Sequence, residues 1–594
     1  MRGAGMSGKK RALQTLPHHL PAPEIAPAER RWLAGLLLLL LGARVWFAWK
    51  VEFTSDETQH LHVVWAWANH LWPYSAAVGD RTLPYRDVFD NHTPLFHLLC
   101  APLFRLFGET AQVMIYMRLA MLPLFAATLW LVAKIGTALF SPRAGWWAAV
   151  LAGFFPLLLL KTVEFRTDEL WMTAWLAVVA IAVCGPLTAR RLFVLGLAVG
   201  AAFAVSMKTV LLVLALLLAG LVVLVLWWRN GGAWRGAKAL GGTGAALAGL
   251  LLVPGLIALY FAAQHALYSA HDPVGTLYYG VIGHNLVPHP DKPGVPMPSR
   301  LFWFPVALPL LVGAAVWIFR RAARPAQGLR RALVLVMGGG FLALLHSYWP
   351  MITEQDYLPV TPLLAVLVAP GALALGEVLH ARRAGLPRLA LPLALVALEF
   401  AGTDKFIKLR PRADEGIGQI AEVLRYTDSG DYVMDAKAGA IFRRRPFYFA
   451  LENVTLRRFH LGLLKDDIIE RMIATRTCVA SDKRLDGPVL AFVHANYLPG
   501  EGRYAVAGQR LRPAADGRAA FSIHIAATYA LVTPHGAAAG TLDGRPYAGK
   551  VFLDAGRHEF VSDHPSEPLN LVWAQALERG FQPDFSAKTE TEAP

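Results

Sequence analysis

The chain has 594 residues, of which 55% are hydrophobic and only 17% are charged. This composition excludes an ordinary soluble enzyme, because apolar runs long enough to span a bilayer, about 20 residues each, recur along the chain. The formal net charge of +15 comes from Lys and Arg residues that cluster in short segments between the apolar runs. Such clusters are typical of cytoplasmic loops and argue against nucleic-acid binding.

The membrane part of the chain begins after a polar N-terminal segment. Residues 1–31 contain several Lys, Arg and Pro residues and lack a cleavable signal pattern, so we expect a disordered cytoplasmic tail. We expect residues 32–402 to form a polytopic α-helical membrane module. Its apolar runs predict about eleven spans, at 32–49, 114–140, 145–163, 169–186, 191–207, 209–228, 239–262, 301–319, 331–349, 357–380 and 386–402.

The basic clusters orient these spans. The apolar segment 94–107 is short for a span and contains Pro102 and Arg105, so we expect a juxtamembrane helix there. If this helix does not cross the membrane, all the basic clusters lie on the same side of it, and the positive-inside rule makes that side cytoplasmic. The loops 51–113 and 263–300 then lie on the outer face. We interpret 51–113 as a catalytic loop with juxtamembrane helices and 263–300 as a lid.

Long apolar runs end near residue 403, so we expect residues 403–594 to form an outer soluble domain. Residues 403–500 indicate mixed α/β structure, with helices at 415–426 and 465–474 and strands at 431–435 and 488–493. Residues 501–594 alternate in polarity, and Asp543-Gly544 is a hairpin signal, which together predict a small antiparallel β-sandwich. The domain contains only Cys478, so it has no internal disulfide.

Two acid pairs lie at membrane boundaries on the outer face. Asp56-Glu57 follows the first span, where a carboxylate stays ionised and can act as a general base on an acceptor hydroxyl or amine. Asp168-Glu169 opens the fourth span, next to Arg166. Helix capping is the structural alternative for both pairs. Their recurrence on one face favours the interpretation that they converge on a single cavity.

Candidate phosphate-binding residues lie in the same outer segments. The segment YRDVFDNHTPLF places Arg86, Asp87, Asp90, Asn91 and His92 directly before the juxtamembrane helix. Cations there would hold an anionic lipid phosphate while the apolar helix meets the lipid tail. Lys208 is expected at the outer ends of two spans, against the usual charge bias, which favours phosphate binding or ion pairing.

The 263–300 loop contains several His and Asp residues, but their spacing fits no compact ligand motif. A divalent metal therefore stays an alternative to the lid interpretation, and no cofactor is indicated with certainty. The sequence has no P-loop, GxGxxG, GxSxG or HExxH motif, so it gives no support for nucleotide use on the cytoplasmic side.

The order of these motifs resembles a known family. An acidic pair after the first span is followed by Y-R-D-x-F-x-x-H-x-P-L, R-T-D-E-L, G-L-A-V-G-A-A-F-A-V-S-M-K and D-Y-L-P-V-T-P-L-L-A. Over roughly residues 33–402 this set is similar to the GT-C membrane glycosyltransferases. The branch that it most resembles holds the bacterial aminoarabinose transferases of lipid A and the protein O-mannosyltransferases.

The resemblance implies a fold and a function. Such enzymes transfer a sugar from a polyprenyl phosphate such as undecaprenyl phosphate to an acceptor, and direct attack on the anomeric carbon is expected to invert its configuration. The acceptor is an envelope lipid, glycan or protein. The resemblance implies an inner-membrane protein with a cytoplasmic N-terminus and a periplasmic outer domain. Asp56 would be the base or acceptor-orienting group, with Glu57 as its neighbour and Asp168 as the second acid. Donor-phosphate ligands would be Arg81, Arg86, His92 and Lys208, and substrate contacts Asp87, Asp90, Asn91, Arg166 and Tyr357.

Two departures leave the sugar open. His92-Thr93-Pro94-Leu95 stands where aminoarabinose transferases have Lys-Pro-Pro-Leu, and Asp356 stands where a basic residue often precedes Tyr-Leu-Pro. A constant positive charge is thus replaced by a titratable one. Two other classes stay as alternatives. One is a lipid or polysaccharide transporter, and the other is a non-catalytic scaffold that displays a glycan-binding outer domain.

Overall fold

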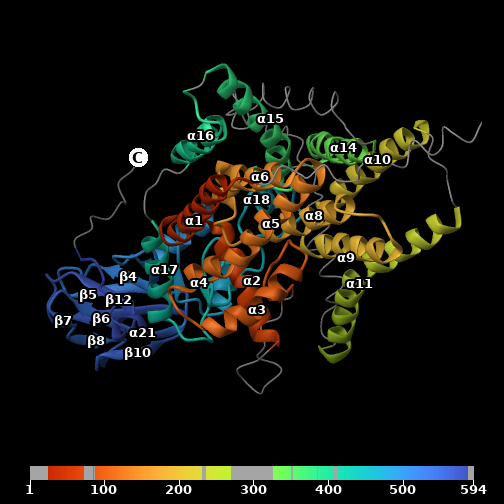
Figure 1. Ribbon diagram of the computed structural model, residues 1–594. Helices are drawn as coiled ribbons and strands as arrows, with labels where there is room; N and C mark the ends of the chain where they lie inside the picture. The colour runs from red at the N-terminus through yellow and green to blue at the C-terminus, as the bar shows by residue number, and fades with distance from the viewer. Residues whose placement is uncertain are drawn as a thin grey trace, which may run out of the picture.

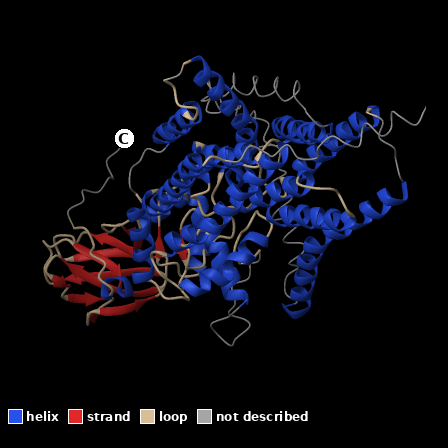
Figure 2. Cartoon of the chain, viewed as in Figure 1, coloured by secondary structure: helices blue, strands red, loops and turns tan. Residues whose placement is uncertain are grey.

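The computed structural model describes residues 25–71, 84–85, 87–230, 236–268, 325–349, 352–383, 385–406 and 412–585. Arg81, Arg86, most of the expected tail, most of the 263–300 loop and the expected span 301–319 lie outside these residues. The described chain has a helical half and a sheet-rich half, which pack against each other (Figures 1 and 2).

The helical half contains the following elements: α1 Pro27–Lys50, α2 Ser55–Leu71, α3 Leu95–Phe107, α4 Val113–Ala120, α5 Leu122–Leu139, α6 Pro142–Phe154, α7 Pro156–Lys161, α8 Thr167–Val183, α9 Ala189–Val205, α10 Thr209–Arg229, α11 Gly236–Tyr268, α14 Pro325–Tyr348, the 3-10 helix η4 Glu354–Tyr357, α15 Thr361–Arg382 and α16 Ala390–Phe406. Because α1 begins at Pro27, residues 27–31 belong to this helix and not to the tail expected for 1–31.

The helices confirm a polytopic membrane protein. In the described ranges, six helical segments are long and apolar enough to cross a membrane: Pro27–Lys50, Val113–Leu139, Thr209–Arg229, Gly241–Tyr260, Gln327–Tyr348 and Thr361–Arg382. The span expected at 145–163 is divided into α6 and α7 at Phe155, whose backbone is extended. Pro156 explains this break, because a residue before proline is disfavoured in the helical conformation.

Glycines allow α9 and α11 to cross closely. The motif Gly196-Leu-Ala-Val-Gly200 faces α11, where an added Cβ on Gly196 would lie 1.9 Å from the Ala246 carbonyl oxygen. Gly249 of α11 makes the matching close approach to α9, since a Cβ there would lie 2.1 Å from the Phe193 carbonyl oxygen. This is the small-xxx-small pattern that brings membrane helices into backbone contact. The crossing sets the position of α9, whose outer end leads to Lys208.

The sheet-rich half, which is called the outer half after its expected position, contains α17 Ala413–Tyr426, β1 Val433–Met434, α18 Asn453–His460, α19 Ile468–Ala474, β2 Val479–Ala480, α20 Gly487–Asn496, β3 Tyr497–Leu498, β4 Ala505–Leu511, β5 Arg518–Ile523, β6 Ala527–Thr533, β7 Gly536–Ala537, β8 Gly540–Leu542, β9 Arg545–Pro546, β10 Lys550–Leu553, β11 Gly556–Ser562, β12 Leu569–Trp573 and α21 Ala574–Glu578. One sheet has the order β1-β2-β4-β12-β6-β10, with β3 on β4 and β7 on β6. The other has the order β5-β11-β8-β9. Both contribute to one apolar core.

Three sequence expectations can be compared with this domain. Asp543 and Gly544 both have left-handed backbone angles and join β8 to β9, which confirms the hairpin. The strand expected at 488–493 is wrong, because these residues lie in α20. Pro488 occupies the first turn of this helix, and a short apolar run does not distinguish helix from strand by its period. The expected boundary at residue 500 does not separate the strands, because β2 before it pairs with β4 after it in the large sheet.

The two halves share apolar and polar contacts. Ile441 and Phe442 of the outer half are fully buried in the core cluster of the helical half, and Phe442 packs on Phe104 of α3 with ring centroids 5.6 Å apart. The Nδ1 atom of His62 in α2 lies 2.9 Å from the Ile441 carbonyl oxygen. The segment from about 435 to 452 is therefore packed directly against α2 and α3. As expected, α3 is a short helix, 13 residues long.

The α9–α11 crossing can be tested with two matched glycines. Gly196→Leu should destabilise the protein by about 1–3 kcal/mol or more, because the side chain has no space against α11. Gly220→Leu in α10 should have little effect, since nothing lies within 4 Å of a Cβ at that position. Thermal unfolding of the purified protein in detergent measures both. Equal unfolding temperatures for the two variants would contradict the close crossing.

Candidate functional site

A cavity of about 800 Å³ lies between the two halves. The helical half lines it with the start of α2, the end of α7 and Glu354, and the outer half lines it with α17 and the loops near residues 435–441 and 481–484. Ser55 and Lys437 are among its lining residues. Ser55 precedes Asp56 in the chain and Lys437 forms an ion pair with it, so the first candidate acid lies next to residues that line this cavity.

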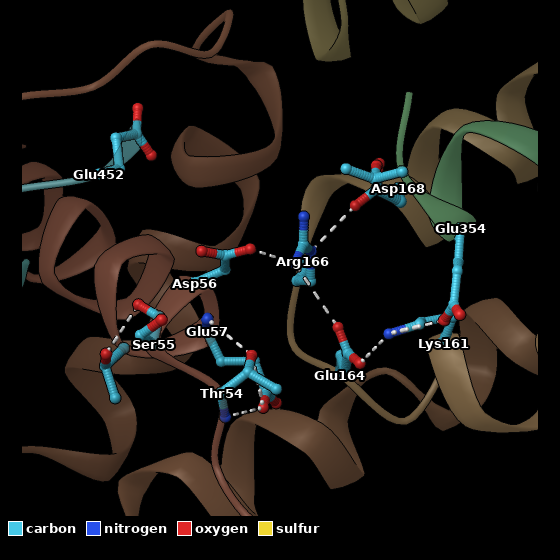
Figure 3. Close-up of polar contacts among 12 residues, drawn as sticks. Thr54, Ser55, Asp56, Glu57, Lys161, Glu164, Arg166, Asp168, Glu354 and Glu452 are labelled. Atoms are coloured by element: carbon cyan, nitrogen blue, oxygen red, sulfur yellow. Dashed lines mark hydrogen bonds and ion pairs between the residues drawn. The ribbon is translucent and has the colours of Figure 1, made fainter. Parts of the chain in front are cut away.

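Asp56 is held between two cations from different parts of the chain. Its Oδ2 atom accepts a hydrogen bond of 2.6 Å from Arg166, which precedes α8, and its Oδ1 atom accepts one of 2.5 Å from the Lys437 ammonium. Arg166 also donates to Asp168 at 3.0 Å and lies 3.6 Å from Glu164 (Figure 3). The structure thus brings the two expected acids together through one guanidinium.

The electrostatics of this cluster keep Asp56 ionised. Burial alone would raise the pKa of Asp56, but the charges of Arg166 and Lys437 outweigh it and hold this pKa well below its usual range. The side chain stays 39% exposed. A carboxylate held in this way is a weak proton acceptor and a strong hydrogen-bond acceptor. It can orient the hydroxyl or ammonium of an acceptor before any proton moves.

Glu57 has a different environment from its neighbour. It is fully buried, and Arg118 of α4 donates two hydrogen bonds to its carboxylate, at 2.7 and 2.6 Å. The backbone N–H groups of Thr54 and Phe165 donate to it at 2.9 and 2.8 Å. Thr54 and Glu57 also form the capping box of α2, because the Glu57 N–H donates back to the Thr54 hydroxyl. The helix-capping role therefore falls to Glu57, which leaves Asp56 free for other contacts.

Arg118 extends this anchor to the end of α1. Its guanidinium donates to the carbonyl oxygens of Ala48, Val51 and Glu52. Glu57 and Arg118 therefore join the end of α1, the start of α2, α4 and the segment before α8. The structure places Glu57 as a structural partner of the site.

A chain of histidines lies behind Asp56. His60, one turn after Asp56 in α2, has its Nδ1 atom 2.9 Å from His97 Nε2. Asp90 accepts hydrogen bonds from the His92 backbone N–H and ring at 2.9 and 3.1 Å and lies 3.0 Å from His97. Burial, together with His92 and His97, lowers the pKa of His60 well below its usual value, so its ring is neutral near pH 7. His92 and Asp90 are thus joined, whereas Asn91 donates to Glu452 of the outer half at 3.4 Å.

The remaining expected residues occupy separate positions. Lys208 forms an ion pair with the fully buried Asp356 and lies 5.8 Å from the ring centroid of Trp171. Asp356 also accepts hydrogen bonds from the Thr353 N–H and hydroxyl, which fixes it at the start of η4. The Tyr357 hydroxyl lies 2.9 Å from His346 Nε2. Tyr357 is thus directed at α14, away from the Asp56 contacts.

Tyr448 of the outer half contacts the segment that carries Asp87 and Asp90. Burial and the charges of Asp90 and Asp87 raise the pKa of Tyr448. The Tyr448 hydroxyl donates to the Tyr85 carbonyl oxygen at 2.8 Å. Tyr85, Phe89 and Asn91 therefore all contact the outer half. Among the residues that the structure describes, no group of three or more His, Cys, Asp or Glu residues could hold a metal ion.

Sequence reasoning missed three residues of the site. Arg118 could have been found, because a lone Arg within the apolar run VMIYMRLA must have a buried partner. His60 could also have been found, since it lies four residues after Asp56 on one helix face. Lys437 had no such signal, because it lies in an unremarkable DAKAGA loop more than 380 residues from its partner.

No family model matches the sequence, and no curated protein matches it by sequence. In structure, the chain is similar to ArnT from Cupriavidus metallidurans bound to undecaprenyl phosphate, with a TM-score of 0.55 and 14% identity over 80% of this chain and 98% of ArnT. The apo state of the same protein gives a TM-score of 0.52 at 13% identity, over 81% of this chain and 98% of that one. This likeness confirms the expected GT-C fold.

The buried Glu57–Arg118 pair can be tested by removing one or both charges. Arg118→Met should destabilise the protein by about 3–5 kcal/mol, because Glu57 is then left charged and unpaired in an apolar site. Glu57→Gln combined with Arg118→Met should recover part of that loss, since no charge remains buried. Thermal unfolding in detergent compares the two variants. A double variant less stable than Arg118→Met would contradict the role assigned to the pair.

Proposed function

We propose that this protein is a membrane glycosyltransferase that moves a sugar from an undecaprenyl-type phosphate to an acceptor on the outer face of a bacterial inner membrane. The acceptor is an envelope lipid, glycan or protein. One observation carries the proposal: an ionised, partly exposed Asp56 lies beside a large cavity between the two halves of a GT-C fold. The likeness to an ArnT structure that holds undecaprenyl phosphate supports the choice of donor.

The transfer needs only charge placement and orientation. The acceptor oxygen or nitrogen attacks the anomeric carbon, and the bond from that carbon to the donor phosphate breaks. The polyprenyl phosphate leaves with the bonding electrons, and the acceptor proton goes to Asp56 or to the departing phosphate. Attack opposite to the leaving group inverts the anomeric configuration. Cations are needed where the phosphate gains charge.

The proposed roles follow from the contacts. Asp56 orients the acceptor, and Arg166 links it to Asp168, so that both acids stay ionised and separated. Lys208 and His92 are proposed as phosphate ligands. Glu57 is proposed to hold the start of α2 in place and not to contact substrate, because its oxygens already accept hydrogen bonds from Arg118 and backbone N–H groups. Arg81 and Arg86, also proposed as phosphate ligands, lie outside the described residues.

Asp56 is the residue on which the proposal is tested. Asp56→Asn should lower sugar transfer by about 10²–10⁴-fold while leaving donor binding intact, because the charge that orients the acceptor is lost. Asp168→Asn should show a smaller loss, since it acts through Arg166. The measurement is transfer from polyprenyl-phosphate sugars to envelope extracts by protein in lipid vesicles.

Glu415→Gln is the matched control. Glu415 lines the same cavity and lies 3.7 Å from Arg412, so its change should leave the rate unchanged. If the wild type transfers no sugar from any donor offered, the transferase proposal fails and the scaffold alternative is favoured. If the wild type is active and Asp56→Asn equals it, only the role of Asp56 fails.

The Lys208–Asp356 pair gives a second test of donor binding. Lys208→Met should weaken binding of undecaprenyl phosphate by roughly tenfold or more, because a charged hydrogen bond to the phosphate is lost. Asp356→Asn should strengthen it, since Asp356 no longer competes for the Lys208 ammonium. Equilibrium binding of labelled undecaprenyl phosphate in detergent measures both. If both variants bind undecaprenyl phosphate with wild-type affinity, Lys208 is not part of the donor site.

A further inference from the structure

A rigid turn of the outer half points one lysine into the helical half. The turn is built around Asp435, whose carboxylate accepts hydrogen bonds of 2.6–3.0 Å from the backbone N–H groups of the residues that follow it, Lys437, Ala438, Gly439 and Ala440. Arg445 donates to the Asp435 and Ala436 carbonyl oxygens. Gly439 has a φ of +52°, and a Cβ there would lie 2.2 Å from the Arg443 carbonyl oxygen. The direction of the Lys437 side chain is thereby fixed by its own domain.

Lys437 is nearly buried and has few partners. Its side chain is 6% exposed, and its ammonium lies 2.5 Å from Asp56 and 3.4 Å from Glu452. A buried ammonium is stable only when acceptors satisfy it, so this contact has a strict geometry. The next residues of the turn also hold the helical half, because His62 contacts the Ile441 carbonyl oxygen. Both ends of the Lys437–Asp56 contact are therefore fixed.

We propose that the outer domain supplies Lys437 to the transfer site as a positioning residue for Asp56. Lys437 fixes the Oδ1 atom of Asp56 and keeps the carboxylate ionised, while Arg166 fixes the other oxygen. The outer domain is thus a part of the site and not an appended module. This inference rests on the proposed transferase function, and it concerns a residue that no sequence motif marked.

The charges around Asp56 explain why a second cation is needed. The groups that face Asp56 or its two cations are Arg166, Lys437 and His60, and behind them Asp168, Glu164 and Glu452. Arg166 already serves Asp168 and Glu164 as well as Asp56. His60 is neutral near pH 7 and supplies no compensating charge. Without Lys437, Arg166 would be left as the cation that contacts Asp56, and Arg166 also contacts Asp168 and Glu164, the second of which pairs with Lys161 as well. Asp56 would therefore gain a proton at a higher pH.

The experiment compares pH–rate profiles of the full-length protein in lipid vesicles. Lys437→Met should move the acidic limb of the transfer rate upward by about 1–3 pH units, because burial raises the pKa of Asp56 once one cation is gone. Donor binding, measured with undecaprenyl phosphate, should stay within about twofold of wild type. Lys437→Arg should restore the wild-type limb. Lys550→Met is the control, because Lys550 belongs to the same domain, pairs with Glu578 on the surface and does not line the cavity.

The outcomes separate the two proposals. A Lys437→Met profile that superimposes on that of an active wild type overturns the role of Lys437 and leaves the transferase function standing. A loss that is uniform across pH and that Lys437→Arg does not rescue also overturns it. If Lys437→Met does not fold, Lys437→Gln replaces it, because glutamine keeps a hydrogen-bond donor. The acidic limb of its pH–rate profile is then compared with that of the wild type. An inactive wild type counts against the transferase function itself.

Discussion

The buried ion pair between Glu57 and Arg118 is the constraint on which the candidate site depends. It fixes the first turn of α2 against the end of α1, α4 and the segment that leads into α8. Those are the segments that carry Asp56, Arg166 and Asp168. The two adjacent acids therefore have different roles. Glu57 is shielded from water and holds the backbone, whereas Asp56 is partly exposed and contacts Arg166 and Lys437.

The sequence sufficed for those features that local pattern controls. Hydropathy located the long helices, and Asp543-Gly544 located a hairpin, because both depend on nearby residues. Motif order indicated the fold that the similarity to ArnT confirms. The strand expected at 488–493 was wrong because a short apolar run has no decisive period. The Lys437–Asp56 contact was not predictable, since it joins residues that only the packing of two halves brings together.

Ion pairing accounts for the departures from the family pattern noted in the sequence. Asp356, in place of a basic residue, lies against Lys208 and neutralises its charge. His92, in place of a lysine, is held by Asp90 in a network that also contains His97 and His60. The positive charge around Asp56 is therefore distributed differently from that expected of an aminoarabinose transferase, with Arg166 and Lys437 in direct contact with Asp56.

The order of strands in the outer sheet sets the order of events during synthesis. Strand β12 lies between β4 and β6, although it is the last strand of the chain in the described region. The large sheet therefore cannot close until residue 573 has been synthesised, after all the described helices of the helical half. Until then the turn that carries Lys437 has no completed domain to support it. The helical half of a nascent chain is thus synthesised in full before the contact between Lys437 and Asp56 has a completed domain behind it.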